Sequence, residues 1–380
     1  MKKLRLCFVV ESGTDVRMVE GLAEHFDLTI FARQIPGGVE ISHPPSCTIP
    51  IAVGSPSQMK FGLQICHYLW KQRNNIDCVL VQGYGFAALA ANLLSRKTGI
   101  LTLMLICSPT ESYYYCRKLF SSQGKAFRYY EYWGIKFVAR LNALIGQHYI
   151  VLSQYLKNVV LGHGTRLPVH IIPIYGIDVK RFSPPELSKQ ELKQKMGLPN
   201  HGLLIFFSSR IAPEKDSETL LAAFRQLLDE GENLWMLHRS GGYQLFMQSA
   251  EHYGVAHRVI ATNAVHPHQH LPQDYQACDL CIQASREEGL GFSVLEALSC
   301  ELPVIAAAVG GLQETIINNE TGWTYQVGNA DALAACIKTF LNNYSQGKEM
   351  AERGREKVNL NYRRELVFMH FTELIQSLKP

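Results

Sequence analysis

The chain has 380 residues, of which 47% are hydrophobic and 18% charged, and its net charge is +4. At about 100–200 residues per domain, this length suggests two domains. The composition excludes a disordered chain and a small disulfide-stapled scaffold, and the weak positive charge gives no ground for nucleic-acid binding.

Ten cysteines and a short apolar run near the N-terminus indicate the cellular compartment in which the protein is expected. The cysteines follow no framework spacing, which is typical of reduced core residues in a reducing compartment. The apolar run at residues 6–10 is too short for a signal peptide or a membrane span. We therefore expect a cytoplasmic protein.

Short apolar runs predict strands that are buried on both faces, and segments of helical periodicity lie between them. The expected strands are residues 4–10, 28–32, 78–82, 101–106, 149–152, 203–207, 234–237, 279–283 and 303–307. The expected helices are residues 15–26, 86–96, 188–196, 217–229, 243–253, 294–300, 330–342 and 362–378. Buried strands that alternate with helices predict parallel sheets, and this number of strands favours two sheets over one.

The turn-rich segment Ser183-Pro184-Pro185 follows the first set of strands. We therefore predict two doubly wound, Rossmann-like α/β domains, at residues 1–180 and 181–358. Residues 359–380 contain a helix that follows the second sheet, and we expect it to cross back to the first domain. Because ligands of open α/β sheets bind beyond the carboxyl ends of the strands, we expect the functional residues in the loops at those ends.

Two cations follow the first predicted strand of the second half. Arg210 and Lys215 lie between the strand end at Ser209 and a helix for which Asp216 is a good N-cap. Cations beside the positive end of a helix dipole suit a diphosphate. The alternative is that they form surface ion pairs with local acids such as Glu214.

A glycine-bearing loop joins a later strand to the next helix. Gly289 and Gly291 allow the backbone to approach a ligand closely, and the helix start offers free amides. Glu288 in the loop and Glu296 in the helix carry carboxylates, which accept hydrogen bonds from sugar hydroxyls. The alternative for Glu296 is a capping box with Ser293.

The dipeptide Gly310-Gly311 repeats this design after the next predicted strand. It offers another set of amides for an anion at the start of a helix. The alternative is an ordinary strand-to-helix turn.

In order and spacing, these motifs resemble the group-1 (family 4) retaining glycosyltransferases with the GT-B fold, over roughly residues 145–345. A GT-B fold has two doubly wound domains that face a central cleft. The segments that carry the resemblance are Pro173-x-x-Gly176-Ile177-Asp178, Ser209-Arg210 with Lys215, Glu288-x7-Glu296, Gly310-Gly311-x-x-Glu314 and Asn319-Glu320-Thr321-Gly322. Ser209 and Asp216 stand where that family has glycines.

The resemblance implies retaining transfer of a sugar from a nucleoside-diphosphate sugar. It implies that Arg210 and Lys215 neutralise the diphosphate, that catalytic Glu288 lies by the donor sugar and that Glu296 binds the ribose. The further donor-binding residues that it implies are Ser209, Gly289, Leu290, Gly291, Phe292, Gly310, Gly311 and Glu314. We expect no metal and no other cofactor, because the two cations take the metal's place.

The first half of the chain matches that family poorly. Gly13, followed by Thr14, stands where the family often has a glycine pair, and residues 107–111 replace its His-Asp. We take Gly13, Thr14, Ser108 and Glu111 as acceptor-side candidates. The expected acceptor is a glycan, a glycolipid or a small molecule.

Two spacings suggest metal binding. Cys278-x-x-Cys281 has no second pair and lies at a predicted buried strand, so core packing is the favoured interpretation. His266-x-His268-x-His270 has no evident acidic partner, and a loop between a strand and a helix explains it as well. We predict no metal site at either.

Residues 113–140 contain ten aromatic residues, six lysines or arginines and one acid, Glu131. Aromatics interleaved with cations suit lipid headgroups, and we predict peripheral contact with the cytoplasmic face of a membrane as one interpretation. The favoured alternative is a helix whose aromatic side chains pack on the first sheet while its cations reach solvent.

Two other functions stay open beside a glycosyltransferase. A sugar-nucleotide 2-epimerase-like enzyme has the same architecture, although the Glu288-x7-Glu296 spacing argues against it. A nucleotide-sugar-binding subunit that has lost catalysis is the other, because the first half is diverged.

Overall fold

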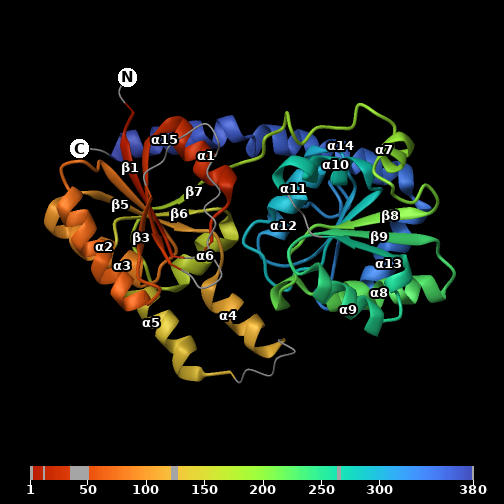
Figure 1. The fold of residues 1–380 in the computed structure, drawn as a ribbon, viewed down its shortest axis with the longest axis horizontal. Coiled ribbons are helices and arrows are strands. Elements are labelled where there is room, and N and C mark those ends of the chain that lie inside the picture. The colour runs from red at the N-terminus through yellow and green to blue at the C-terminus, as the bar shows by residue number, and fades with distance from the viewer. Residues whose placement is uncertain (1–2, 12, 35–50, 121–126, 263–266, 379–380) are drawn as a thin grey trace. The chain divides into compact units, whose positions relative to one another are not determined.

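The computed structural model describes residues 3–11, 13–34, 51–120, 127–262 and 267–378. The chain divides into two compact units. Unit 1 comprises Met1–Tyr114, Phe127–Gly176 and Arg364–Pro380, and unit 2 comprises Tyr115–Ala126 and Ile177–Arg363. Each unit is an α/β structure around one parallel sheet, as the alternating pattern of the sequence predicts (Figure 1).

Unit 1 contains a seven-stranded parallel sheet in the order β3-β2-β1-β4-β5-β6-β7. The strands are β1 (Arg5–Val10), β2 (Asp27–Arg33), β3 (Ile51–Gly54), β4 (Cys78–Gln82), β5 (Leu101–Ile106), β6 (His148–Val151) and β7 (Val169–Ile171). The helices are α1 (Val16–His25), α2 (Gln58–Gln72), α3 (Phe86–Thr98), α4 (Thr110–Leu119), α5 (Tyr129–Ile145), α6 (Gln154–Gly162) and α15 (Arg364–Leu378). The second half of α4 is assigned to unit 2.

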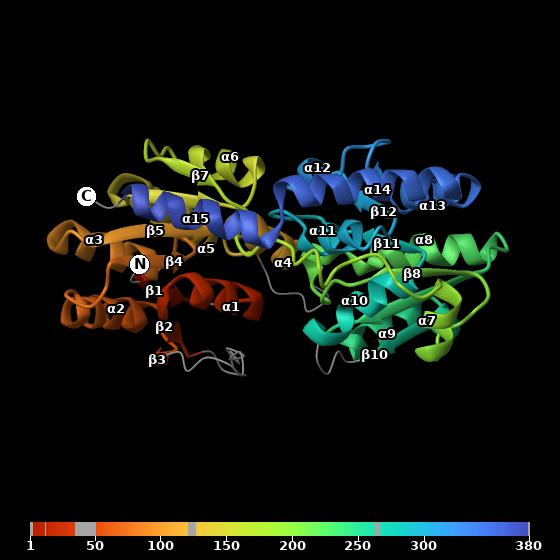
Figure 2. The same ribbon diagram turned by 90° about the horizontal axis from the view of Figure 1, so that it is seen from above.

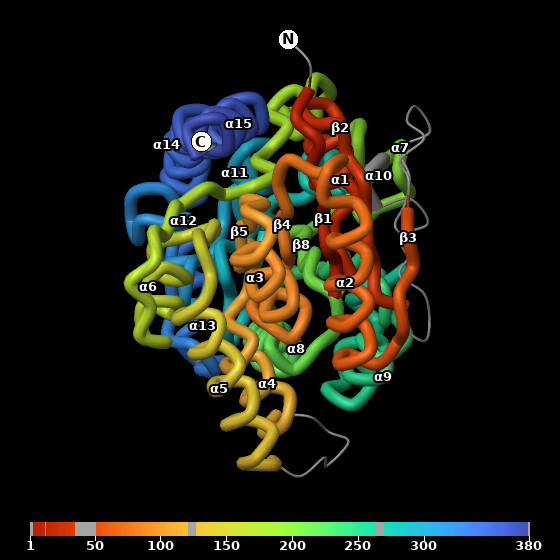
Figure 3. Tube along the Cα trace, turned by 90° about the vertical axis from the view of Figure 1, so that its left-hand side faces the viewer, coloured from red at the N-terminus to blue at the C-terminus, as the bar shows by residue number. Residues whose placement is uncertain are grey.

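Helices cover both faces of this sheet, which is why its central strands are apolar throughout. All six residues of β5 are buried. On one face α2 and α3 pack against each other, and Figure 3 shows them side by side. Gly62 of α2 lies at this contact, where a Cβ would reach ordinary van der Waals distance, 3.4 Å, from the carbonyl oxygen of Phe86 in α3.

The last helix, α15, belongs to unit 1 and lies beside α1 (Figure 1). The ring of Phe368 stacks on His25 with centroids 5.2 Å apart, and Phe371 meets Phe26 edge-on at 5.7 Å. A Cβ at Gly21 would lie 2.0 Å from the ring of Phe368, so the small residue makes room for the aromatic one.

Unit 2 contains a six-stranded parallel sheet in the order β10-β9-β8-β11-β12-β13. The strands are β8 (Leu203–Phe207), β9 (Leu234–Arg239), β10 (Val259–Thr262), β11 (Leu280–Gln283), β12 (Val304–Ala307) and β13 (Trp323–Tyr325). The helices are α7 (Lys189–Lys195), α8 (Ser217–Asp229), α9 (Tyr243–His252), α10 (Pro267–Ala277), α11 (Phe292–Ser299), α12 (Leu312–Thr315), α13 (Ala330–Asn342) and α14 (Tyr344–Asn361), with 3₁₀ turns η1 (Pro213–Lys215) and η2 (Ala256–Arg258). Figure 2 labels part of each strand order: β3, β2, β1, β4 and β5 in the first sheet, and β10, β8, β11 and β12 in the second.

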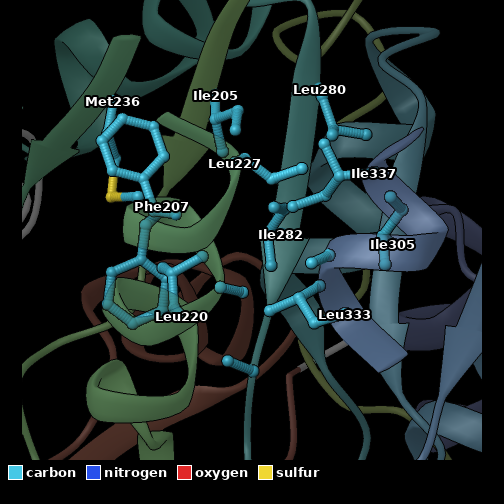
Figure 4. Packing of buried hydrophobic residues seen from close by; sticks show 14 of the residues in the cluster. Ile205, Phe207, Leu220, Leu227, Met236, Leu280, Ile282, Ile305, Leu333 and Ile337 are labelled. Atoms are coloured by element: carbon cyan, nitrogen blue, oxygen red, sulfur yellow. The ribbon is translucent and has the colours of Figure 1, made fainter. Parts of the chain in front are cut away.

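One face of the second sheet forms a large apolar core with α8, α9 and α13 (Figure 4). Alternate residues of a strand point to the same face, so Ile205 and Phe207 of β8 share this face with Ile282 of β11. Leu333 and Ile337 of α13, which are four residues apart, pack against them. This core fixes the carboxyl ends of β8 and β11, from which the candidate site extends.

Candidate functional site

The candidate site of unit 2 lies at the point where the strand order reverses. β8 and β11 are neighbours, but the chain continues from β8 to β9 on one side and from β11 to β12 on the other. In open α/β sheets such a reversal leaves a crevice beyond the carboxyl ends of the two strands, where ligands bind. The loops that carry Arg210, Lys215 and Glu288 leave these two strands.

Lys215 and Glu288 form a direct ion pair beyond the ends of these two strands. Lys215 ends η1, and its Nζ lies 2.5 Å from Glu288 Oε2 in the loop after β11. Both side chains are nearly buried, with 13% and 12% of their surfaces exposed. The ammonium group has three N–H donors, so one serves Glu288 and two remain for ligand oxygens.

Two neutral side chains that the sequence did not single out as site residues bond Glu288, and a third, Ser293, bonds one of them. Ser285 Oγ donates a hydrogen bond to Glu288 Oε2 at 3.0 Å, and Gln283 Nε2 donates to the same oxygen at 3.1 Å. Ser293 of α11 donates to the amide oxygen of Gln283 at 3.0 Å. The signal in the sequence was a single polar residue, Gln283, at the end of an apolar strand.

Glu296 is buried inside unit 2, with 2% of its surface exposed. The hydroxyl of the fully buried Tyr275 donates to Glu296 Oε2 at 2.9 Å, and Ser208 Oγ lies 3.2 Å from that hydroxyl. The helix N-cap is Gly291, not Ser293, so the predicted capping-box alternative for Glu296 is wrong. The structure instead ties Glu296 to the end of β8 through Tyr275.

Arg210 extends toward solvent, with 60% of its side chain exposed, and lies 3.4 Å from Glu214 Oε1. Glu214 is fully buried and also accepts hydrogen bonds from Arg117 of α4, at 2.6 Å to Oε1 and 3.1 Å to Oε2. Burial acts to raise the pKa of Glu214, but the hydrogen bonds and charge of Arg117 outweigh it and hold that pKa below its usual range. The sequence named Glu214 as a local partner of the cations and missed Arg117.

The predicted N-cap of α8 is confirmed. Asp216 accepts a hydrogen bond from the backbone N–H of Thr219 and adopts a left-handed backbone conformation, with φ of 49°. Its carboxylate also accepts from Arg286 at 2.7 Å. Asp216 therefore holds Arg286, which precedes Glu288 by two residues, against the start of α8.

The two glycine-bearing loops pack directly on each other. Gly291 has φ of 93°, and the Gly311 N–H donates to the Glu288 carbonyl oxygen at 2.9 Å. A Cβ at Gly311 would lie 2.3 Å from the Gly289 carbonyl oxygen. The Gly311 amide is therefore used inside the protein, and this glycine permits close packing of the loop that carries Glu288.

The remaining predicted donor-side residues lie around these loops. Leu290 is buried, Phe292 begins α11 and is half-buried, and Ser209 is buried after β8. Gly310 has φ of 51°. Glu314 lies in α12, where its backbone carbonyl accepts from the Lys357 ammonium at 2.5 Å.

The four acceptor-side candidates lie at the carboxyl ends of strands in unit 1. Gly13 and Thr14 follow β1, and Ser108 and Glu111 follow β5. β1 and β4 are the strands at which the order of this sheet reverses. Gly13 is exposed, Ser108 is half-buried, and the buried Thr14 Oγ1 has no hydrogen-bond partner among the described residues.

Glu111 is the best connected of the four. It lies in the first turn of α4, accepts from His163 Nε2 at 2.5 Å and also accepts from the hydroxyl of Tyr84. Burial acts to raise the pKa of Glu111, but hydrogen bonds from His163 and Tyr84 hold it below its usual range. His163 and Tyr84 carried no signal in the sequence, because each comes from a different segment.

The aromatic and basic segment at residues 113–140 forms parts of α4 and α5, and residues 121–126 lie outside the described part. The buried residues of α5 are Val138, Ala139, Asn142 and Ala143. Its aromatic side chains are turned outward: Trp133 is 57% exposed and Phe137 63%, and Tyr129 and Tyr130 are exposed as well. The favoured prediction that these aromatics pack on the first sheet is therefore wrong for these four.

The two sequence spacings that suggest metal binding, one of cysteines and one of histidines, lie in different surroundings. Cys278 and Cys281 are fully buried in unit 2, as core packing predicts. His266 lies outside the described residues. Across the described ranges, no three His, Cys, Asp or Glu side chains gather as a metal-binding group, and no helix is long and apolar enough to cross a bilayer.

A second buried charge pair lies at the end of β9. Arg239 Nε is 2.8 Å from Oδ1 of Asp274, which belongs to α10 and is 2% exposed. Burial raises the pKa of Asp274 to about 7 against the opposing charge of Arg239. Because the folded state holds the proton more tightly than the unfolded one, Asp274 stabilises the fold below pH 4, and this contribution is lost as the pH rises to about 7.

Asp274→Asn is therefore expected to flatten the pH dependence of stability. The variant resembles the protonated wild type near pH 4 and is more stable than the wild type at pH 8, by up to about 4 kcal/mol for a shift of three pKa units. Denaturant unfolding of both proteins at intervals from pH 4 to pH 8 measures this difference. Parallel stability curves for the two proteins would contradict it.

Comparison with known sequences finds similarity in the second half of the chain. Residues 188–357 match the sequence model of the glycosyl transferases, group 1. The chain is also similar to a GDP-mannose-dependent alpha-(1-6)-phosphatidylinositol monomannoside mannosyltransferase of Mycolicibacterium smegmatis, at 27% identity over 195 residues. That alignment covers 49% of this chain and 50% of the relative's own length.

Solved structures show the same fold over nearly the whole chain. A sucrose-phosphate synthase from Thermosynechococcus elongatus matches with a TM-score of 0.81 at 20% identity, covering 99% of both chains. The HepE protein of Anabaena in complex with UDP matches with a TM-score of 0.78 at 17% identity, covering 99% of this chain and 100% of that one. The predicted α/β fold of the GT-B type is confirmed.

Proposed function

We propose that the chain is a retaining glycosyltransferase of family 4 that moves a sugar from a nucleoside-diphosphate sugar to an acceptor. The observation that carries the proposal is the pairing of Lys215 with Glu288 at the reversal point of the second sheet, with Arg210 in the same segment after β8 as Lys215. The match of residues 188–357 to group 1 glycosyl transferases supports it. The UDP in the HepE complex and the GDP-mannose in the relative's name support a nucleotide-linked donor.

The proposed reaction breaks the bond between the anomeric carbon of the donor sugar and a diphosphate oxygen. A hydroxyl oxygen of the acceptor forms the new bond on the same face, and its proton passes to the departing phosphate oxygen. Negative charge grows on the diphosphate as the bond breaks. Arg210 and the two remaining donors of Lys215 stabilise this charge, so no metal or other cofactor is required.

The carboxylates hold the rest of the donor in this proposal. Glu288 Oε1 accepts no hydrogen bond from the described residues, so it is available to a hydroxyl of the donor sugar. Glu296, fixed by Tyr275, accepts from the ribose. Gly13, Thr14, Ser108 and Glu111 of unit 1 are proposed to select the acceptor.

The deciding experiment measures binding and turnover with a panel of UDP-, GDP- and ADP-sugars. A nucleoside diphosphate that binds the folded protein raises its melting temperature by mass action. Arg210→Ala is expected to weaken that stabilisation and to slow release of diphosphate from the donor. Stabilisation without turnover on any acceptor would favour a subunit that only binds donor, and conversion of the sugar nucleotide without acceptor would favour a 2-epimerase-like enzyme.

We also propose a glycolipid or lipid-linked acceptor at the cytoplasmic face of a membrane. The relative from Mycolicibacterium smegmatis is named for a phosphatidylinositol mannoside, which is a lipid acceptor. α5 presents exposed Trp133 and Phe137 together with Lys136 and the exposed Arg140, and its described acidic residue is Glu131. Exposed aromatics with cations suit an anionic lipid surface.

The double variant Trp133→Ser/Phe137→Ser is expected to reduce binding to phosphatidylglycerol vesicles at least about tenfold, because both side chains leave the lipid interface. Vesicle flotation measures the bound fraction, with phosphatidylcholine vesicles as the neutral reference. The control is Trp70→Ser, since Trp70 of α2 is 50% exposed outside this surface. Equal flotation of wild type and double variant would refute the membrane proposal.

A further inference from the structure

Gln283 is a polar residue at the end of an otherwise apolar strand, β11, and only 1% of its surface is exposed. A buried amide costs free energy unless its donors and acceptors are paired. The structure pairs all of them. Its carbonyl oxygen accepts from Ser209 and Ser293, each at 3.0 Å, and its amino group donates to Ser285 at 2.7 Å and to Glu288 at 3.1 Å.

The orientation of this amide follows from its neighbours. Serine hydroxyls can donate or accept, but an ionised carboxylate can only accept. Glu288 Oε2 also accepts from Lys215, so the Gln283 atom that faces it must be the amino group. The carbonyl oxygen then faces Ser209 and Ser293, whose hydroxyls donate to it.

This one side chain therefore connects three segments of the site. Ser209 follows β8, Ser285 and Glu288 belong to the loop after β11, and Ser293 lies in the first turn of α11. Ser209 is also a departure from the glycine of the resembled family, and its hydroxyl is used here. Glu288 Oε2 accepts hydrogen bonds from Lys215, Ser285 and Gln283, which leaves Oε1 to a ligand.

We infer that Gln283 is a positioning residue that orients Glu288 toward the hydroxyls of the donor sugar. The inference rests on the proposed function of this site. Gln283 acts through Glu288, so its loss should slow the transfer step more than it weakens diphosphate binding. Among the described side chains that bond Gln283, Glu288 is the charged one, and it is paired with Lys215 of η1; the partners after β8 and in α11, Ser209 and Ser293, are neutral.

Two variants test the inference. Gln283→Leu removes the hydrogen bond to Glu288 and is expected to lower kcat about 10- to 100-fold, the range for a hydrogen bond to a charged group. The Kd of UDP or GDP should change less than about threefold. Gln283→Glu keeps the size but places two carboxylates together, which can share a proton only at lower pH. The activity of Gln283→Glu relative to wild type should therefore fall as the pH rises.

Activity is followed as release of GDP from GDP-mannose and of UDP from UDP-glucose, and diphosphate binding is followed by calorimetric titration. The control is Gln276→Glu, because the side-chain amide of Gln276 in α10 donates to the backbone of Ser183 and not to Glu288. Unchanged kcat in Gln283→Leu would overturn the inference, as would a pH-independent loss in Gln283→Glu that tracks its melting temperature. If Gln283→Leu fails to fold, the pH profile of Gln283→Glu decides. If the wild type neither binds diphosphate nor releases it, the proposed function fails instead.

Discussion

Replacing Lys215 by methionine is expected to lower the turnover of the donor sugar nucleotide about 10²- to 10³-fold, the range for loss of one preorganised donor to a developing anion. Methionine keeps the length of the side chain but removes the three N–H donors. Glu288→Gln should reduce turnover by a similar factor, because it removes the anion at the same contact. The rate of diphosphate release is measured first at saturating donor and then as a function of donor concentration.

The double variant Lys215→Met/Glu288→Gln separates catalysis from folding. The single change at Lys215 leaves a nearly buried carboxylate without its cation, and we expect a loss of about 1–3 kcal/mol in the free energy of unfolding. The double variant removes both charges and should regain most of that stability while staying inactive. Lys338→Ala breaks an exposed pair with Glu230 and is the control, expected to change neither quantity. Activity close to wild type in either single variant would contradict the donor-site assignment.

The sequence predicted the parts of the molecule that follow from periodicity and apolar runs. The expected strands at residues 78–82 and 101–106 coincide with β4 and β5, and the expected helix at residues 330–342 coincides with α13. Four short strands were missed: β3, β7, β10 and β13. Each has three or four residues, and all four are edge strands of the two sheets, so no long buried run marks them.

The candidate site was predictable where its residues lie in one segment and unpredictable where they come from several. Arg210, Lys215, Glu288 and Glu296 follow two strand ends and could be found from local chemistry. Tyr275 could not be found, because it reaches Glu296 from a helix that is distant in sequence. The outward aromatics of α5 were also unpredictable, because the sequence does not tell whether a neighbouring layer covers them.

Gly311→Ala should also damage the site, by a purely steric route. The φ of Gly311 is −68°, a conformation that alanine adopts readily, so the backbone itself opposes nothing. The added Cβ, however, would lie 2.3 Å from the Gly289 carbonyl oxygen and 2.7 Å from Leu290 Cα. Both neighbours are backbone atoms, so the loop must move, and such overpacking costs about 1–3 kcal/mol.

That movement reaches Glu288, whose carbonyl oxygen accepts from the Gly311 N–H at 2.9 Å. A displacement of about 1 Å at a reacting group can cost about 10²-fold in rate, so we expect at least a tenfold fall in kcat/KM for the donor together with a lower melting temperature. Gly162→Ala is the matched control, because no atom lies within 4 Å of the added Cβ at the end of α6. That change should leave activity unaltered and the melting temperature equal or slightly higher. If Gly311→Ala retained wild-type kcat/KM, the tight packing of the two glycine loops would have no role in holding Glu288, and the carboxylate's position would have to depend on its side-chain partners alone.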